Sequence, residues 1–191
     1  MTAPRPSAFV SRGGEKLTAA IDHFALDVRG MICADLGAHV GGFTDCLLQR
    51  NAERVYAVDT SYGTFAWKLR RDPRVVTLER TNALHVALPE PVSLVVIDVG
   101  WTPQAKILPI AARLLVPGGR VITLIKPHYE AERHELMGGV LPDALIPGVV
   151  ANVLDGARAD GWDVVGTVDS PIRGHGGNRE VLAYLSLASP E

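Results

Sequence analysis

The chain has 191 residues, of which 19 are Lys or Arg and 21 are Asp or Glu, so its net charge is −2. This length suits one domain with a substantial core, and the acidic balance argues against binding nucleic acid non-specifically over the whole surface. No apolar run approaches the roughly 20 residues of a membrane span, and the first residues lack the apolar core of a signal peptide, so we expect a cytoplasmic protein with no membrane partner.

The first ten residues contain two prolines and little periodicity. We therefore expect residues 1–10 to be a flexible lead-in and residues 11–191 to form one domain. A short amphipathic helix should follow, because apolar side chains recur there with helical spacing. Its apolar positions are Leu17, Ala20, Ile21 and Phe24.

Beyond this helix, apolar runs of strand length alternate with segments of helical spacing, which is typical of a parallel sheet with crossover helices. Strands are expected at 31–36, 54–59, 74–79, 92–98, 119–126, 162–169 and 180–187, and helices at 42–50, 64–71, 103–115 and 144–160. A Pro-Gly-Gly turn over 116–119 should separate a helix from the next strand. The last two strands are joined by a loop too short for a parallel crossover, so they should pair antiparallel. The predicted fold is α/β, with a seven-stranded, mainly parallel sheet, one antiparallel strand and helices on both faces.

The polar segment 130–139 shows neither the helical nor the strand spacing of apolar residues. We expect it to be mobile, either as a lid or as a long loop. Cys33 and Cys46 should be small buried side chains and not a disulfide. The six histidines lack the spacing of metal ligands, so no metal is expected.

A glycine-rich turn over 34–45 joins the first predicted strand to the next helix. Gly37, Gly41 and Gly42 let the backbone turn sharply and approach a ligand closely. Asp59 ends the second strand, where a carboxylate can bind the hydroxyls of a ribose. These residues predict a nucleotide-like cofactor, although a tight turn that binds nothing could contain the same glycines.

The spacing in this turn distinguishes between cofactors. From Asp35 to Gly42 it reads D-x-G-x-x-x-G-G, which departs from the G-x-G-x-x-G of dinucleotide-binding turns. Asp35 would repel a pyrophosphate but suits a cofactor that carries an ammonium group. The turn therefore favours S-adenosylmethionine over NAD, and it disfavours an NAD-dependent oxidoreductase.

Asp98 and Lys126 each come directly after an apolar strand, at the edge where ligands bind in such sheets. Lys126 precedes Pro127 and would be held rigidly and partly desolvated, which favours the neutral amine that a base requires. A snorkelling surface lysine would fit the same pattern. Lys16 and Glu180 look ordinary by themselves, as a charged helix start and a charged strand start.

Basic residues fall into three groups that could form a local basic face. They are Arg5, Arg12 and Lys16, then Lys68, Arg70, Arg71 and Arg74, and finally Arg173 and Arg179. For the middle group we prefer a solvated helix end, because runs of charge usually mark such surfaces.

Eight segments, in order, carry a resemblance that spans nearly the whole chain. They lie at 9–17, 41–48, 55–59, 66–70, 78–83, 95–99, 124–127 and 170–180. Together they resemble the hemolysin A (TlyA) branch of the FtsJ-like RNA 2′-O-methyltransferases. The resemblance implies a Rossmann-like methyltransferase fold, S-adenosyl-L-methionine as cofactor, and RNA as substrate, with ribosomal RNA favoured.

The resemblance also implies a catalytic set, namely Lys16, Asp98, Lys126 and Glu180. Lys126 would lie nearest the ribose 2′-hydroxyl, Asp98 and Glu180 would hold its ammonium, and Lys16 would place the nucleotide. Two carboxylates favour a charged lysine, whereas desolvation and a second lysine favour a neutral one. Whether Lys126 is a base or an orienting cation therefore stays open at this point.

The implied cofactor-binding residues are Asp35, Gly37, Ala38, Gly41, Gly42, Phe43, Asp59, Asn82 and Asp98. The loop 37–43 would hold the methionine part of the cofactor, Asp59 the ribose and Asn82 the adenine.

The chain departs from this branch at three places. Members usually carry an N-terminal S4 RNA-binding domain, whereas only about ten residues precede the matching region here, so we expect RNA to be docked without one. His39 and Val40 replace a pair of small hydroxyl residues, and could tune cofactor binding or weaken it. After Asp98, the segment 100–103 replaces a more typical serine-phenylalanine start, and its Trp101 could stack on a base or simply pack.

The main hypothesis is thus an S-adenosylmethionine-dependent 2′-O-ribose methyltransferase that acts on RNA. A small-molecule methyltransferase is favoured by the acidic balance. A catalytically silent, RNA-associated protein of the same fold is opposed by the presence of all four catalytic positions. The hemolysin label suggests pore formation, but no membrane-length segment and no amphipathic segment of the pore-forming kind supports it. The sequence leaves the oligomeric state open.

Overall fold

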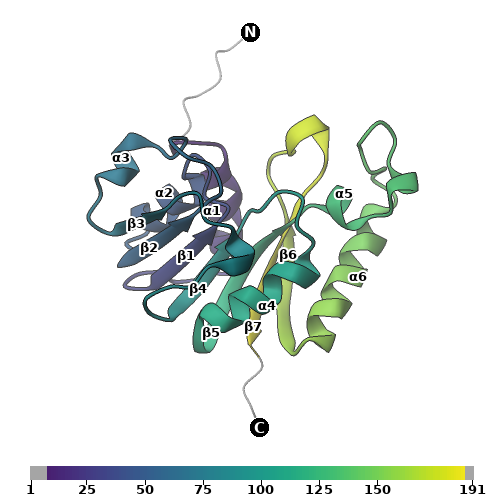
Figure 1. Ribbon diagram of the computed structural model, residues 1–191. Coiled ribbons are helices and arrows are strands. Elements are labelled where there is room, and N and C mark those ends of the chain that lie inside the picture. The colour runs from purple at the N-terminus through teal and green to yellow at the C-terminus, as the bar shows by residue number, and fades with distance from the viewer. Residues whose placement is uncertain (1–7, 188–191) are drawn as a thin grey trace.

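A computed structural model of the chain describes residues 8–187 and shows a seven-stranded sheet between two layers of helices (Figure 1). The strands are β1 (Ile32–Leu36), β2 (Arg54–Val58), β3 (Val75–Leu78), β4 (Val92–Ile97), β5 (Leu115–Ile125), β6 (Trp162–Asp169) and β7 (Val181–Leu187). The helices are α1 (Gly13–His23), α2 (Gly42–Gln49), α3 (Trp67–Arg70), α4 (Gln104–Leu114), α5 (Pro127–Glu130) and α6 (Ile146–Ala159). Short 3₁₀ turns are η1 (Ala83–His85), η2 (Arg133–Glu135) and η3 (His175–Gly177).

The strand order is β3-β2-β1-β4-β5-β7-β6. Strands β1 to β5 pair in parallel, whereas β7 runs antiparallel to both β5 and β6. The predicted mainly parallel sheet with one antiparallel strand is confirmed.

Two apolar clusters cover the two faces of the sheet, since successive strand side chains point to opposite faces. Leu36 of β1 joins one cluster with α4 and α6, and Cys33 of the same strand joins the other with α1 and α2. The prediction for the cysteines is confirmed, because Cys33 and Cys46 are both free and buried. Within residues 8–187, no helix is long and apolar enough to cross a membrane.

The helix predicted over 64–71 is much shorter, and that boundary is wrong. Only Trp67–Arg70 is helical, because the Ala66 backbone is extended, with a ψ of 131°. The Ala66 N–H donates to Val40 O at 3.0 Å instead of joining a longer helix. Packing against the glycine-rich turn therefore overrides the helical spacing.

The turn predicted over 116–119 lies inside β5 and does not precede it, so this boundary is also wrong. Pairing shifts from Val92 with Leu115 to Leu94 with Arg120, which leaves extra residues on β5 as a bulge. Gly118 accommodates the bulge with a φ of 72°.

Most of the predicted flexible lead-in lies outside the described residues, but its last part, 8–10, contacts the domain. The Val10 N–H donates to Asp45 Oδ2 at 2.8 Å, and Phe9 packs against the α1 and α2 cluster. Packing thus begins before the predicted domain boundary at residue 11.

The segment 130–139, predicted as a lid or long loop, contains the end of α5, the turn η2 and the start of a small bridge between Met137 and Val140. Asn178 links it to the loop before β7, because its side chain accepts from Leu141 N at 3.1 Å and donates to Gly139 O at 3.1 Å. These two hydrogen bonds tie the two loops together.

Candidate active site

The predicted site residues meet at the edge where the parallel strands end. Gly37 follows β1, Asp59 follows β2, Asp98 follows β4 and Lys126 follows β5. Strand β7 runs the other way, with Val181 paired to Ile125, so the residue just before it, Glu180, reaches the same edge. The sheet thus gathers groups that are far apart in the sequence.

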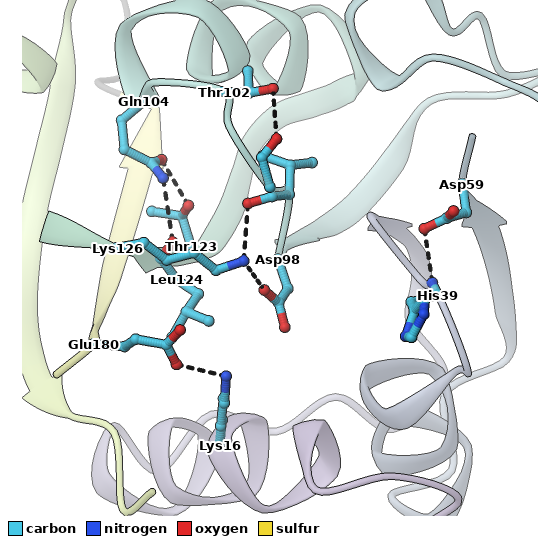
Figure 2. Close-up of polar contacts among 12 residues, drawn as sticks. Lys16, His39, Asp59, Asp98, Thr102, Gln104, Thr123, Leu124, Lys126 and Glu180 are labelled. Carbon is cyan, nitrogen blue, oxygen red and sulfur yellow. Dashed lines mark hydrogen bonds and ion pairs between the residues drawn. The ribbon is translucent and has the colours of Figure 1, made fainter. Parts of the chain in front are cut away.

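Asp98 and Lys126 form an ion pair at this edge (Figure 2). Lys126 Nζ lies 2.6 Å from Asp98 Oδ1 and donates to Val99 O at 3.0 Å. Because an ammonium has three N–H donors, one remains for a ligand. The expected contact between Asp98 and Lys126 is confirmed.

Glu180 belongs to a second ion pair, with Lys16 of α1 (Figure 2). Lys16 Nζ lies 2.5 Å from Glu180 Oε2, and the two side chains are only 11% and 3% exposed. The expectation that Glu180 would hold the ammonium of Lys126 is therefore wrong. Helix α1 packs against β7 and brings Lys16 to the carboxylate instead.

Gly174 leaves the space that the Glu180 carboxylate occupies. A Cβ at position 174 would lie 2.2 Å from Glu180 Oε1, so any larger residue would displace the carboxylate. The loop before β7 thus packs closely against the second ion pair, and this packing requires glycine at position 174.

Two cavities lie along the glycine-rich turn and share Gly37, His39 and Asp98 in their lining. The first, of about 350 Å³, extends between the ends of β1, β2 and β4 and includes Lys126. The second, of about 250 Å³, extends towards α1 and includes Lys16. Each ion pair therefore contributes its lysine to a different cavity, and Asp98 stands between them.

The predicted cofactor residues are divided between these cavities. Asp59 and Asn82 line the first, and Ala38, Gly42 and Phe43 line the second. Asp35 and Gly41 are buried and line neither. At Gly37, a Cβ would lie 2.5 Å from Asp98 O, and φ is 90°, so only glycine fits between the cavities.

Asp59 fixes the shape of the turn as well as lining the first cavity. Its Oδ2 accepts from His39 N at 2.8 Å and its Oδ1 from Ser61 N at 2.7 Å. Burial opposes its ionisation, but these bonds outweigh burial and keep the pKa of Asp59 below its ordinary value. His39 has a φ of 48°, so its place in the turn depends on this contact.

Asn82 also combines two roles. Its Oδ1 accepts from Leu84 N at 2.9 Å and caps η1, which positions the residues after β3 around the first cavity. Thr81, Ala83 and Leu84 line that cavity too, and were missed. Their place directly after the third strand was the signal that could have found them.

Asp35 is fully buried beneath the turn. Its Oδ2 accepts from Thr44 N at 2.9 Å and from Thr44 Oγ1 at 2.6 Å, while Oδ1 has no hydrogen-bond partner among residues 8–187. Burial raises the pKa of Asp35 to about 7, opposed by the Thr44 bonds and assisted by the charges of Asp98 and Asp59. Asp35 therefore holds the start of α2 and lines neither cavity.

Trp101 projects from the loop after β4, beside the first ion pair. Its side chain is 84% exposed, and its ring stacks on Tyr129 with centroids 4.6 Å apart. Trp101 thus packs on Tyr129 and also stays exposed, so both expectations for it, packing and stacking on a base, stay open. One broad face of an aromatic pair is thus offered to solvent next to Lys126.

The three groups of basic residues have different surroundings. Arg12 and Arg173 line the second cavity, whereas the middle group lies outside both cavities. In that group Lys68 pairs with Asp45 and Arg70 pairs with Glu79. Among the described residues, no group of three or more His, Cys, Asp or Glu side chains is placed to hold a metal.

Comparison with known proteins finds one family model and several relatives that match most of the chain. The model of the FtsJ-like methyltransferase family matches residues 9–187. The 16S/23S rRNA (cytidine-2′-O)-methyltransferase TlyA of Mycobacterium tuberculosis is 41% identical over 183 residues, covering 93% of this chain and 68% of that protein. Hemolysin A of Brachyspira hyodysenteriae is 40% identical over 185 residues, covering 94% of this chain and 77% of that protein. The match to a Bacillus subtilis relative, YqxC, covers 94% of this chain but only 66% of the length of YqxC.

Solved structures agree with these relatives. A Streptococcus thermophilus protein, described as a candidate hemolysin, has a TM-score of 0.94 at 40% identity, covering 98% of this chain and 70% of that one. The N-methyltransferase NodS of Bradyrhizobium japonicum, solved with S-adenosyl-L-homocysteine, has a TM-score of 0.64 at 16% identity, covering 94% of this chain and 86% of that one. The distant likeness shows a shared fold.

Proposed function

Because the chain belongs to the FtsJ-like methyltransferase family, we propose that it transfers a methyl group from S-adenosylmethionine to a ribose 2′-hydroxyl in RNA. The observation that carries this proposal is the Asp98–Lys126 pair, which stands at the junction of two cavities. Ribosomal RNA is the substrate that the name of the Mycobacterium tuberculosis relative suggests. The site of action would then be the cytoplasm.

The two cavities suit the two halves of the cofactor. Asp59 would bind the ribose hydroxyls and Asn82 would face the adenine, since both line the first cavity. The glycine-rich turn, bare of side chains at Gly37, would receive the methionine part. When bound, S-adenosylmethionine supplies an electrophilic methyl carbon on a sulfonium leaving group.

The first ion pair would prepare the attacking hydroxyl. Lys126 already donates to Asp98 and to the Val99 carbonyl, so its third N–H can orient the ribose oxygen. Asp98 Oδ2 is not engaged by Lys126 and can accept the hydroxyl proton. We therefore infer that Lys126 is an orienting cation and that Asp98 takes the proton.

The second ion pair would position the nucleotide. Lys16 lines the second cavity while Glu180 holds its ammonium from below. Trp101 would offer a stacking face to an unpaired base beside Lys126. These roles place the RNA on the side of the cavities away from the sheet.

The test incubates the chain with methyl-labelled S-adenosylmethionine and either purified ribosomal RNA, ribosomal subunits or a pool of small metabolites. Digestion of the RNA should then release 2′-O-methylated nucleosides, and Lys126→Ala should abolish the label. Label in metabolites alone would identify a small-molecule methyltransferase. Cofactor binding without any transfer would identify a catalytically silent protein, and no cofactor binding would overturn the whole proposal.

A further inference from the structure

The four charged side chains at the base of the site cancel one another in pairs. Lys16 is bound to Glu180 and Lys126 to Asp98, at 2.5 Å and 2.6 Å. The chain as a whole carries a net charge of −2. A polyanionic substrate would therefore find no net attraction in these four groups or in the overall charge.

Two further cations face the second cavity. Arg12 lies directly before α1 and Arg173 lies in the loop between β6 and β7, and both line this cavity together with Lys16. No other arginine in the described range 8–187 lines either cavity at the site. Two segments from opposite ends of the chain thus bring two arginines to one cavity.

Neither arginine is held by a short, buried ion pair among the described residues, so both can take a ligand. Arg12 is exposed and forms no ion pair within residues 8–187. Arg173 Nη2 lies 3.4 Å from Asp143 Oδ2, in a pair whose side chains are 56% and 54% exposed. Such a long, solvated pair contributes little, so an incoming anion can displace it. Arg173 Nη1 donates to Gly177 O at 2.8 Å, which holds the side chain in place.

Cations elsewhere in the described part of the chain are engaged more firmly. Arg74 Nη2 lies 2.7 Å from Asp72 Oδ2, and Lys68 Nζ lies 2.9 Å from the buried Asp45. Neither side chain lines the second cavity. Among the described residues, the arginines available to a substrate at the two cavities are therefore Arg12 and Arg173.

We propose that Arg12 and Arg173 form a phosphate-binding rim that grips the RNA backbone on both sides of the target nucleotide. A guanidinium matches a phosphate with two parallel hydrogen bonds, which a lysine cannot reproduce. Contacts of this kind fix position and register but read no sequence. The inference rests on the proposed function, because it assigns the substrate backbone to the same site.

The test compares Arg12→Gln and Arg173→Gln with the unaltered chain, using ribosomal RNA and labelled S-adenosylmethionine. Each substitution should raise the KM for RNA by about five- to thirtyfold, as expected for a lost charged hydrogen bond. The slope of log KM against log salt should fall by roughly 0.7 for each contact removed. The Kd for S-adenosylhomocysteine should change much less than the KM for RNA, because the adenosine part would lie in the first cavity, which neither side chain lines.

Arg29→Gln is the matched control. Arg29 is an exposed arginine that pairs with Asp27 ahead of β1, at the opposite edge of the sheet. Its loss should leave the KM for RNA and the salt slope unchanged. Arg173→Lys should recover the salt slope but only part of the KM, since it restores charge without the planar fork.

A binding measurement separates failure of the rim from failure of the reaction. A fluorescent single-stranded RNA oligonucleotide is titrated at low salt with each variant. If RNA is never methylated but binding still depends on Arg12 and Arg173, the proposed reaction fails and the rim stands. If the unaltered chain and both variants bind alike, or none binds, the rim is overturned.

Discussion

The two ion pairs of the site are built from the same residue types but by different parts of the fold. Asp98 and Lys126 follow the neighbouring parallel strands β4 and β5, so sheet order alone places them together. Lys16 and Glu180 are 164 residues apart and meet only because β7 reverses direction and packs beside α1. A contact between adjacent strand ends can be anticipated, whereas one that depends on which helix packs beside the reversed strand cannot.

The pairs also differ in what surrounds them. Asp98 and Lys126 line the first cavity, and Lys126 contacts a backbone carbonyl there. Glu180 is almost fully enclosed, and its carboxylate occupies the space that a side chain at Gly174 would need. This difference suggests that the first pair serves the reaction and the second pair holds the substrate side of the site in shape.

The largest effect should come from breaking the first pair. Lys126→Met removes the orienting ammonium and should lower kcat by about 10³- to 10⁴-fold, roughly 4 to 5.5 kcal/mol of barrier. Binding of S-adenosylhomocysteine, followed by calorimetry, should persist. Lys106→Met, at an exposed position on α4, is the control and should keep full activity. A loss smaller than tenfold for Lys126→Met would remove that residue from the reaction.

Breaking the second pair should chiefly affect stability. Glu180→Gln leaves the ammonium of Lys16 buried without its partner, which should cost about 3 to 5 kcal/mol in the free energy of unfolding. Asp155→Asn, which breaks the exposed pair with Arg158, should cost less than about 1 kcal/mol. Urea unfolding measures both. Equal costs would show that the two pairs stabilise the fold to the same small extent.

A double substitution sharpens this distinction. Lys16→Met with Glu180→Leu removes both charges and should regain most of the stability lost in Glu180→Gln, because an apolar pair needs no compensation. Methylation should remain low in the double variant. Recovered activity would mean that the second pair only supports the fold.

The charge of Asp98, in the first pair, helps to raise the pKa of Asp35, so the contribution of Asp35 to stability should depend on pH. Its pKa is raised from 3.8 to about 7, so the folded chain keeps a proton that the unfolded chain releases between about pH 4 and 7. The contribution of Asp35 to stability therefore falls as pH rises through this window and is constant above it. Asp35→Asn should remove a slope of at most about 1.4 kcal/mol per pH unit. Unfolding measured at several pH values tests this, and parallel profiles for the two proteins would contradict it.

The smallest effect should come from the aromatic face beside the first pair. Trp101→Ala should raise the KM for RNA roughly fivefold, which corresponds to about 1 kcal/mol of binding free energy lost with the stacking on a base. Stability should change by less than about 0.5 kcal/mol, because the side chain is 84% exposed. Trp101→Phe should restore most of the affinity. An unchanged KM would show that no base stacks there.

Several parts of the site were predictable because each depends on local sequence. Gly37 was marked by its place between an apolar strand and a helix, and the structure shows that a side chain there would collide with Asp98. Asp98 and Lys126 were marked by apolar runs that end in a charge. Arg12 and Arg173 were predicted only as members of two separate basic groups, because local sequence does not show that the fold places them beside one cavity.

The sequence by itself determined which segments become strands and helices, and which charged residues stand at their ends, since both follow from the spacing of apolar side chains. Tertiary structure decided which charges meet. Glu180 binds Lys16 and not Lys126, although β7 lies beside β5, because α1 packs against β7 and reaches the carboxylate first. Local periodicity contains no information about distances across a sheet, and ion pairs depend on those distances.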